Sequence, residues 1–292
     1  MLSSRKTTFI LSILLAISTF LCVFLTVQPH LPGVREILPE ATLEVSAPYL
    51  SGTYLTGHTI EVEGESAEAN ELYNLIFTAY EDLDCRSVAF DTDLPEEKVQ
   101  ELLTKAFGGA FVFDDLRGTY TVHGRHYNAI LRRQQVNGYQ TQIWIRDTAG
   151  EIRDSLGENP TDMSVIQAVN DRICREVEYT GTNRTINYYP DSNATGAVQG
   201  GAICSGYAKL FTCLMVELGY KTAYISGETE GGYKHAWNEV YLEDGSTVYV
   251  DVTWNDEGDG TPYLSTKPFE DRTVSRRTIY SPLRGSSQVR LS

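Results

Sequence analysis

The sequence contains few cysteines, and their spacing argues against a zinc site. Five cysteines stand at positions 22, 85, 174, 204 and 213, and no two of them form a C-x-x-C pair. Zinc sites normally use such pairs, so we expect no metal and no other cofactor. The acidic run at 255–260 could attract Ca²⁺ but is more simply a solvated loop. A disulfide between two of Cys85, Cys174 and Cys213 stays open, because spacing cannot assign one.

Positive charge is also scarce. The chain has 24 Lys and Arg against 39 Asp and Glu, which gives a formal net charge of −15. Binding of nucleic acid requires clustered basic side chains that neutralise phosphates, so nucleic acid is excluded as a partner. The hydrophobic content of 41% in 292 residues is sufficient for a folded core and excludes general disorder.

The N-terminus carries a long apolar run that lacks a cleavage site. Arg5 and Lys6 precede an apolar or hydroxyl-bearing run from Phe9 to Val27, close to the roughly 20 residues that cross a bilayer as a helix. No A-x-A-like site follows it, so residues 1–27 are predicted to be an uncleaved signal anchor. The flanking charges place the folded part outside the cytoplasm, at the cell surface. Cleavage of the anchor would make the protein secreted.

Composition and periodicity divide the rest of the chain. Residues 28–65 contain four prolines and predict a juxtamembrane linker, residues 66–155 an α+β companion region, residues 156–283 a second domain, and residues 284–292 a flexible tail. In the companion region, apolar spacing predicts helices around residues 72–83 and 95–107. Aromatic-rich segments at 111–113, 118–124, 127–133 and 139–146 predict an antiparallel sheet.

The second domain contains a helix with a cysteine at its start. Tyr207, Phe211, Leu214 and Leu218 recur at helical spacing, and a glycine follows as a stop, so Cys204 is predicted at the helix N-terminus. Unpaired backbone N–H groups at that end favour negative charge and therefore a thiolate, which is the nucleophilic form. Another helix is predicted from residue 161 to about 179, and residues 181–200 predict a polar loop beside the thiol.

A predicted β-hairpin supplies the remaining chemistry. Two alternating runs flank Asp244-Gly245, and each has an aliphatic row at even positions, Val240 and Leu242 in the first and 248, 250 and 252 in the second. If both rows pack into one core, even-numbered residues of one strand must lie opposite even-numbered residues of the other. This pairing requires a turn with an odd number of residues, or a bulge. His235 and Asp251 then share the opposite face.

Three motifs in this order resemble the transglutaminase-like superfamily: GGAICSGYAKLF, HAWNEVYL and VYVDVTWND. The resemblance covers roughly residues 160 to 265. It implies an α+β fold with a papain-like core, in which a nucleophile helix packs on an antiparallel sheet, preceded here by the companion region and the N-terminal membrane helix. It also implies a triad with Cys204 as nucleophile, His235 as general base and Asp251 as the acid that orients the imidazole.

The resemblance implies a mechanism more firmly than a substrate. The superfamily includes cross-linking enzymes, peptidases, deamidases and inactive relatives. We therefore expect a membrane-anchored enzyme of bacterial type that transfers acyl groups of protein or peptide amides through a Cys204 thioester, by transamidation, deamidation or hydrolysis. The alternative is a catalytically inactive module that acts as an interaction protein of the cell envelope. The expected partners are a protein or peptide substrate and, through the N-terminal helix, the membrane; the oligomeric state stays open.

Four further residues are candidates near this triad. Gln199 is a candidate second donor to the oxyanion beside the Cys204 backbone N–H. Trp237 shares the predicted face of His235 and either shields the ion pair from water or is a core residue. Asn238 and Asp256 are rivals of Asp251 as the orienting group, but Asn238 has the wrong strand parity and Asp256 follows the strand.

Overall fold

The computed structural model describes residues 57–82, 85–109, 117–132, 135–181, 190–257 and 263–283. The predicted signal anchor, most of the predicted linker and the tail at 284–292 lie outside these ranges. Within the described part of the chain, every helix is too short or too polar to cross a bilayer.

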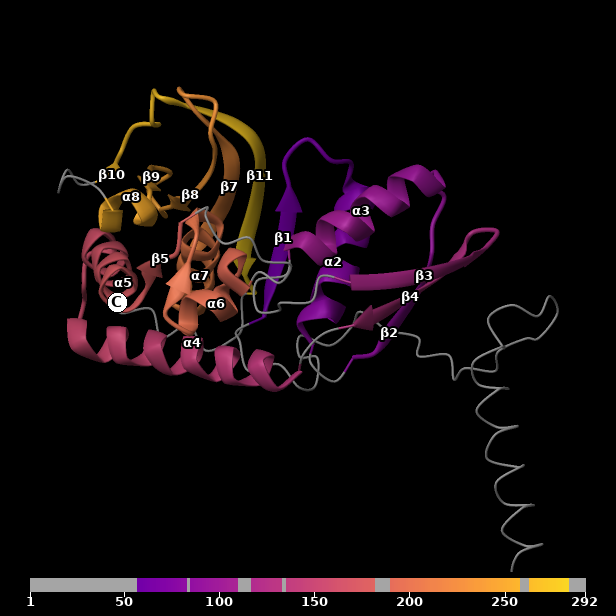
Figure 1. The fold of residues 1–292 in the computed structure, drawn as a ribbon, viewed down its shortest axis with the longest axis horizontal. Coiled ribbons are helices and arrows are strands. Elements are labelled where there is room, and N and C mark those ends of the chain that lie inside the picture. The colour runs from indigo at the N-terminus through magenta and orange to yellow at the C-terminus, as the bar shows by residue number, and fades with distance from the viewer. Residues whose placement is uncertain are drawn as a thin grey trace, which may run out of the picture. The chain divides into compact units, whose positions relative to one another are not determined.

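A six-stranded antiparallel sheet forms the centre of the fold (Figure 1). Its strands follow the order β1-β11-β7-β8-β9-β10, so the last long strand lies between the first strand and the central hairpin. The strands are β1 (His58–Val62), β7 (Lys221–Thr229), β8 (Lys234–Tyr241), β9 (Thr247–Val250), β10 (Leu264–Ser265) and β11 (Arg272–Pro282).

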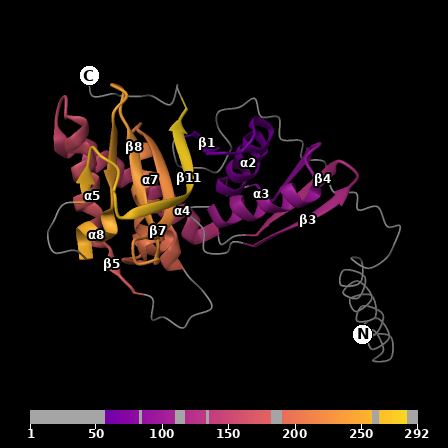
Figure 2. The same cartoon turned by 90° about the horizontal axis from the view of Figure 1, so that it is seen from above.

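Helix α7 (Cys204–Glu217) packs against strands β7, β8 and β11 (Figure 2). Every residue of α7 from Gly206 to Val216 is buried, as expected for a helix that is apolar on most of its surface. Its other sides contact α4 (Gln135–Leu156), α5 (Asp162–Glu176), α6 (Ala194–Val198), α8 (Val252–Glu257) and the 3-10 turn η2 (Pro190–Ser192). The helix that carries the candidate nucleophile is therefore enclosed by the core, and only Cys204 and Ser205 at its start and Glu217 at its end are less buried.

A second, smaller group of helices and strands precedes this core in the chain. Helices α2 (Ala67–Glu81) and α3 (Glu96–Gly109) accompany a three-stranded sheet of order β2-β4-β3, with β2 at Ser87–Asp91, β3 at Arg117–His123 and β4 at His126–Arg132. Both helices and the β3–β4 hairpin match the predictions. Asn74 and Asn70 of α2 accept hydrogen bonds from the backbone N–H groups of Ile60 (2.6 Å) and Val62 (2.8 Å), which joins this group to β1.

The predicted strand at residues 139–146 is wrong, because this segment is part of the 22-residue helix α4. Its aromatic and β-branched side chains suggested a strand. Its buried positions, however, follow helical spacing and pack against α5, α6 and α7: Gly138, Thr141, Gln142, Ile145, Thr148, Ala149 and Ile152. Helix α4 also crosses the predicted boundary at residue 155, so the core domain begins earlier than expected.

The predicted linker also extends too far. Residues 58–62 form strand β1, which pairs antiparallel with β11 from His58 opposite Pro282 to Val62 opposite Thr278. This pairing joins residues more than 200 positions apart, and no local sequence pattern reports such a partner. The predicted loop at 181–200 likewise contains η2 and α6, the latter capped by the side chain of Asn193, which accepts from Gly196 N at 3.1 Å.

The register of the β8–β9 hairpin confirms the predicted parity. Asn238 lies opposite Val250 and Val240 opposite Val248, so even positions face even positions. Residues 242–246 form the connection between the strands, an odd number, and Leu242 N donates to Ser246 O at 2.9 Å. The second strand of the hairpin, β9, ends earlier than expected, at Val250, because residues 252–257 form α8.

Two helical glycines allow a test of the packing around the nucleophile. A Cβ added at Gly206 of α7 would lie 2.4 Å from Asp191 O and 2.8 Å from Ala202 Cβ, whereas one at Gly150 of α4 would meet nothing within 4 Å. We expect Gly206→Ala to lower the free energy of unfolding by about 1 to 3 kcal/mol. Gly150→Ala should raise it by about 0.5 to 1 kcal/mol through helix propensity alone. Urea unfolding of both variants measures the difference, and equal effects would contradict the close contact of η2 with α7.

Candidate active site

Cys204 is the first residue of α7, as predicted. The N-cap residue, Ile203, offers no side-chain acceptor, so the first-turn N–H groups are not capped by a side chain. The approach to the helix is held by backbone contacts instead: Ile203 N donates to Asp191 O at 2.9 Å, and Ser205 Oγ donates to Ser192 O at 2.6 Å. Cys204 is half-buried and is a free thiol. It is therefore positioned at the positive end of a helix dipole.

His235 lies near the start of β8, opposite Gly227 of β7. Its side chain is packed between two indoles: the ring centroid of Trp237 lies 6.2 Å away and nearly parallel to it, and that of Trp254 lies 5.4 Å away. Only 9% of His235 is exposed. The imidazole is thus largely shielded from water, which strengthens any charge interaction that it makes.

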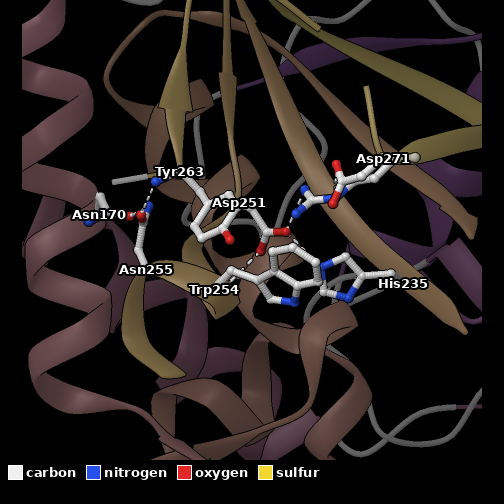
Figure 3. Close-up of polar contacts among 8 residues, drawn as sticks. Asn170, His235, Asp251, Trp254, Asn255, Tyr263 and Asp271 are labelled. Atoms are coloured by element: carbon white, nitrogen blue, oxygen red, sulfur yellow. Dashed lines mark hydrogen bonds and ion pairs between the residues drawn. The ribbon is translucent and has the colours of Figure 1, made fainter. Parts of the chain in front are cut away.

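His235 and Asp251 form a direct pair, on the common face that the hairpin parity predicts (Figure 3). His235 Nε2 lies 2.7 Å from Asp251 Oδ2. A carboxylate at this nitrogen holds the neutral ring as the Nε2–H tautomer and leaves Nδ1 as the nitrogen free to take a proton.

Asp251 is fully buried and is anchored by the backbone as well as by the histidine. Its Oδ1 accepts from the backbone N–H of Trp254 at 3.1 Å, so Asp251 caps the N-terminus of α8. Its own N–H donates to Tyr263 O at 3.0 Å. The carboxylate is therefore fixed by the turn from β9 into α8, without any need of the imidazole.

The surroundings favour the protonated form of His235. Burial disfavours the imidazolium and lowers the pKa, but hydrogen bonds with Asp251 and with Cys204, together with their negative charges, raise the pKa of His235 to about 9. Cys204 contributes to this shift, so the thiol lies near enough to the imidazole to act on its charge. The structure thus brings all three predicted triad residues together, from α7, β8 and the start of α8.

Arg272, the first residue of β11, is a further member of the site that the sequence motifs do not reveal. Its Nη1 lies 2.6 Å from Asp251 Oδ2, the oxygen that also faces His235. The Arg272 side chain is 1% exposed, and its guanidinium lies over the rings of Trp254 at 4.2 Å and Phe269 at 4.3 Å. The motifs give no indication of this contact, because β11 reaches the triad only through its pairing with β7.

The two rivals of Asp251 are engaged elsewhere. Asn238 lies on the opposite strand face and donates to Ala208 O (3.0 Å) and Thr212 Oγ1 (2.9 Å) of α7. Asp256 accepts from the Tyr207 hydroxyl at 2.6 Å, and burial raises the pKa of Asp256. Both residues hold α7 in place rather than orienting the histidine.

The two accessory candidates, Trp237 and Gln199, differ in burial. Trp237 is 3% exposed and stacks on His235, so it is a core residue that also covers the imidazole. Gln199 is the C-cap of α6, and its side chain is exposed. Its backbone N–H bonds to Thr195 O at 3.1 Å, which fixes its main chain before the turn into the nucleophile. Its role as an oxyanion donor stays a prediction.

The remaining described cysteines are also free thiols. Burial raises the pKa of Cys174 to about 12, with Asp256 and Asp171 adding to the effect. Cys213 is buried in the core cluster, and Cys85 Sγ donates to Ser87 O at 3.3 Å. Within the described residues, no three His, Cys, Asp or Glu side chains are grouped closely enough to hold a metal ion. The described part of the acidic run forms the end of α8, where Asn255 bonds to Asn170 at 2.6 Å (Figure 3).

A thiol at the start of a core helix, next to a His–Asp pair on an adjoining sheet, places residues 135–283 among the papain-like α+β cores. Residues 149–252, which include all three triad residues, match the family described as the transglutaminase-like superfamily. Over this segment the chain resembles that superfamily.

Comparison with solved structures gives distant matches. A TGase crystal structure is 16% identical, with 57% of this chain and 50% of that chain covered and a TM-score of 0.33. LapG of Legionella pneumophila is 15% identical over 46% of this chain and 72% of its own, with a TM-score of 0.33. A candidate cysteine protease from Cytophaga hutchinsonii is 12% identical over 57% and 75%, with a TM-score of 0.31. The chain thus spans half the length of the first of these, and the search of curated proteins found no match.

The pKa of His235 predicts a pH dependence of stability. A histidine whose pKa is higher in the folded state stabilises that state fully below its unfolded pKa, and this contribution is lost as pH rises through the folded pKa. We expect the stability advantage of the wild type over His235→Gln to fall between pH 6.5 and about 9. The decrease should be up to about 3 kcal/mol. Urea unfolding across this range measures it, and a constant difference would contradict a raised pKa.

Proposed function

We propose that this chain is a thiol enzyme that transfers the acyl group of protein or peptide amides through a thioester on Cys204. The observation that carries the proposal is the linked set of Cys204, His235 and Asp251, in which the His235 Nε2 to Asp251 Oδ2 distance is 2.7 Å. A protein that only binds a partner has no physical need for a helix-start thiol beside a buried imidazole and carboxylate.

The acylation step uses each member of the set. The Cys204 thiolate attacks the amide carbonyl carbon, a C–S bond forms, and the carbonyl π electrons move to oxygen. The oxyanion is stabilised by the Cys204 backbone N–H and a second donor, for which Gln199 is the candidate. When the oxyanion collapses, the C–N bond breaks and the amine or ammonia leaves with the proton of the His235 imidazolium, which leaves a thioester.

The second step restores the thiol. Neutral His235 takes a proton from water or from an amine as either attacks the thioester carbon, and the C–S bond then breaks with release of the thiolate. Water gives deamidation or peptide hydrolysis, and an amine gives transamidation. Asp251 keeps the imidazole in one tautomer through both steps.

We also propose that the enzyme works outside the cytoplasm, held by residues 1–27. The support is the basic pair at Arg5 and Lys6 ahead of the apolar run.

Selective alkylation tests the activated thiol. Iodoacetamide near pH 6 should label Cys204 selectively, because this thiol lies at a helix N-terminus near His235, whose pKa is raised to about 9. Cys174 should stay unlabelled, since its pKa is about 12. His235→Ala should slow the labelling of Cys204 by at least tenfold, as followed by peptide mass spectrometry. Slow labelling of all thiols alike would instead support a catalytically inactive module.

A second assay separates transfer from hydrolysis. The enzyme is incubated with a glutamine-containing protein and a labelled primary amine, and the products are analysed by mass spectrometry. An amine adduct indicates transamidation, new peptide termini indicate hydrolysis, and a mass increase of about one dalton at glutamine indicates deamidation. Cys204→Ala, the control, should give none of these products. Products formed equally well by this variant would contradict the thioester.

A further inference from the structure

Arg272 is in an unusual environment for an arginine. Its guanidinium is almost fully buried within an aromatic cage, 4.2 Å from the Trp254 ring, 4.3 Å from Phe269, 5.5 Å from Trp237 and 5.6 Å from Tyr263. Its Nη1 forms an ion pair with Asp251 Oδ2 at 2.6 Å, yet Nε, Nη1 and Nη2 all lack a well-aligned hydrogen bond within the described residues. A buried guanidinium normally uses most of its five donors. Electrostatic pairing with Asp251, rather than a full hydrogen-bond network, therefore accounts for its place here.

Arg272 is not needed to hold Asp251 in position. The Asp251 side chain already caps α8 through Trp254 N at 3.1 Å, and its backbone N–H is bound by Tyr263 O at 3.0 Å. Removal of the guanidinium would leave both anchors in place. The main effect of Arg272 on the triad is thus its positive charge beside the oxygen that His235 contacts.

The charged groups around His235 determine how the Arg272 guanidinium acts on the imidazole. Cys204 faces the imidazole from α7, Asp251 from the turn before α8, and Arg272 from β11 through the shared Oδ2, with Asp271 Oδ1 3.6 Å from Arg272 Nε. Arg272 is permanently charged, so it neutralises Asp251 whether or not His235 is protonated. Without it, Asp251 would be a buried carboxylate whose one remaining cationic partner among the described residues is the imidazolium.

We propose that Arg272 is a positioning residue of the triad that shares the charge of Asp251 and so lets His235 release its proton during acyl transfer. The inference rests on the proposed function, since proton release matters only if His235 acts as acid and base. In this arrangement Asp251 orients the imidazole without trapping it as an imidazolium. The aromatic cage keeps water from screening the pair.

The direct test is the titration of His235 in Arg272→Met, which removes the charge but keeps a long apolar side chain in the cage. The ring signal of His235 is followed by NMR across pH in the full chain, and is assigned by its loss in His235→Gln. We expect the titration midpoint of His235 to rise by about one unit or more, because a nearby cation in a shielded site is removed. Arg272→Lys, which keeps a cation, should give a smaller rise.

Arg277→Met provides a matched control on the same strand. Arg277 also pairs with a buried carboxylate, that of Glu239 on β8, through Nε and Nη2 at 2.8 and 2.9 Å, whereas Arg272 pairs with Asp251. The Arg277→Met variant should lower the free energy of unfolding, as should Arg272→Met, but it should leave the titration midpoint of His235 unchanged. An unchanged or lowered midpoint in Arg272→Met would overturn the inference and leave Arg272 a structural residue. An equal rise in Arg272→Lys would overturn it as well, because charge would then not be the cause.

This outcome is separable from that of the proposed function. If iodoacetamide fails to label Cys204 selectively while the His235 midpoint rises in Arg272→Met, the enzymatic proposal fails and the charge-sharing role stands. If Cys204 is selectively labelled and the midpoint does not rise, only the inference about Arg272 fails.

Discussion

The rest of the site depends on the buried carboxylate of Asp251. A carboxylate with no exposed surface costs several kcal/mol in lost hydration unless charged and hydrogen-bonding partners compensate it. Here the compensation comes from three separate elements: His235 of β8, Arg272 of β11 and the first turn of α8. The carboxylate therefore holds the hairpin, the last strand and a short helix together at the point where α7 begins. Correct folding of the sheet and formation of the site are the same event.

The parts of the site that local patterns control could be predicted from the sequence. Helical spacing in α7 placed Cys204 at a helix start, and the parity of two aliphatic rows required the even-to-even register that Val240 and Val248 show. A period-two pattern fixes which side chains share a face, because a slip of one residue would expose the whole row. His235 and Asp251 thus share a face as a consequence of burying valines on the other one.

The parts that depend on contacts distant in sequence could not be predicted. Strand β1 is defined by its pairing with β11. Arg272 reaches Asp251 because β11 pairs with β7, a strand distant in sequence, and not with the preceding strand β10. Helix α4 was missed for a different reason. The β propensity of its aromatic residues favours a strand, but burial of Ile145, Ala149 and Ile152 at helical spacing against other helices outweighs that propensity.

Strand β11 delivers two arginines to two buried carboxylates, and the difference between them is informative. Arg277 bonds Glu239 of β8 through two nitrogens and also contacts Glu63, in the turn that follows β1, so it ties together the segments on both sides of β11. Arg272 offers Asp251 a single nitrogen and stacks on aromatic rings instead. In a chain with 24 basic and 39 acidic residues, a cation buried with unused donors is not explained by stability alone. The Arg272 guanidinium lies beside the carboxylate oxygen that His235 also contacts. From this position its positive charge can act on the imidazole without direct contact.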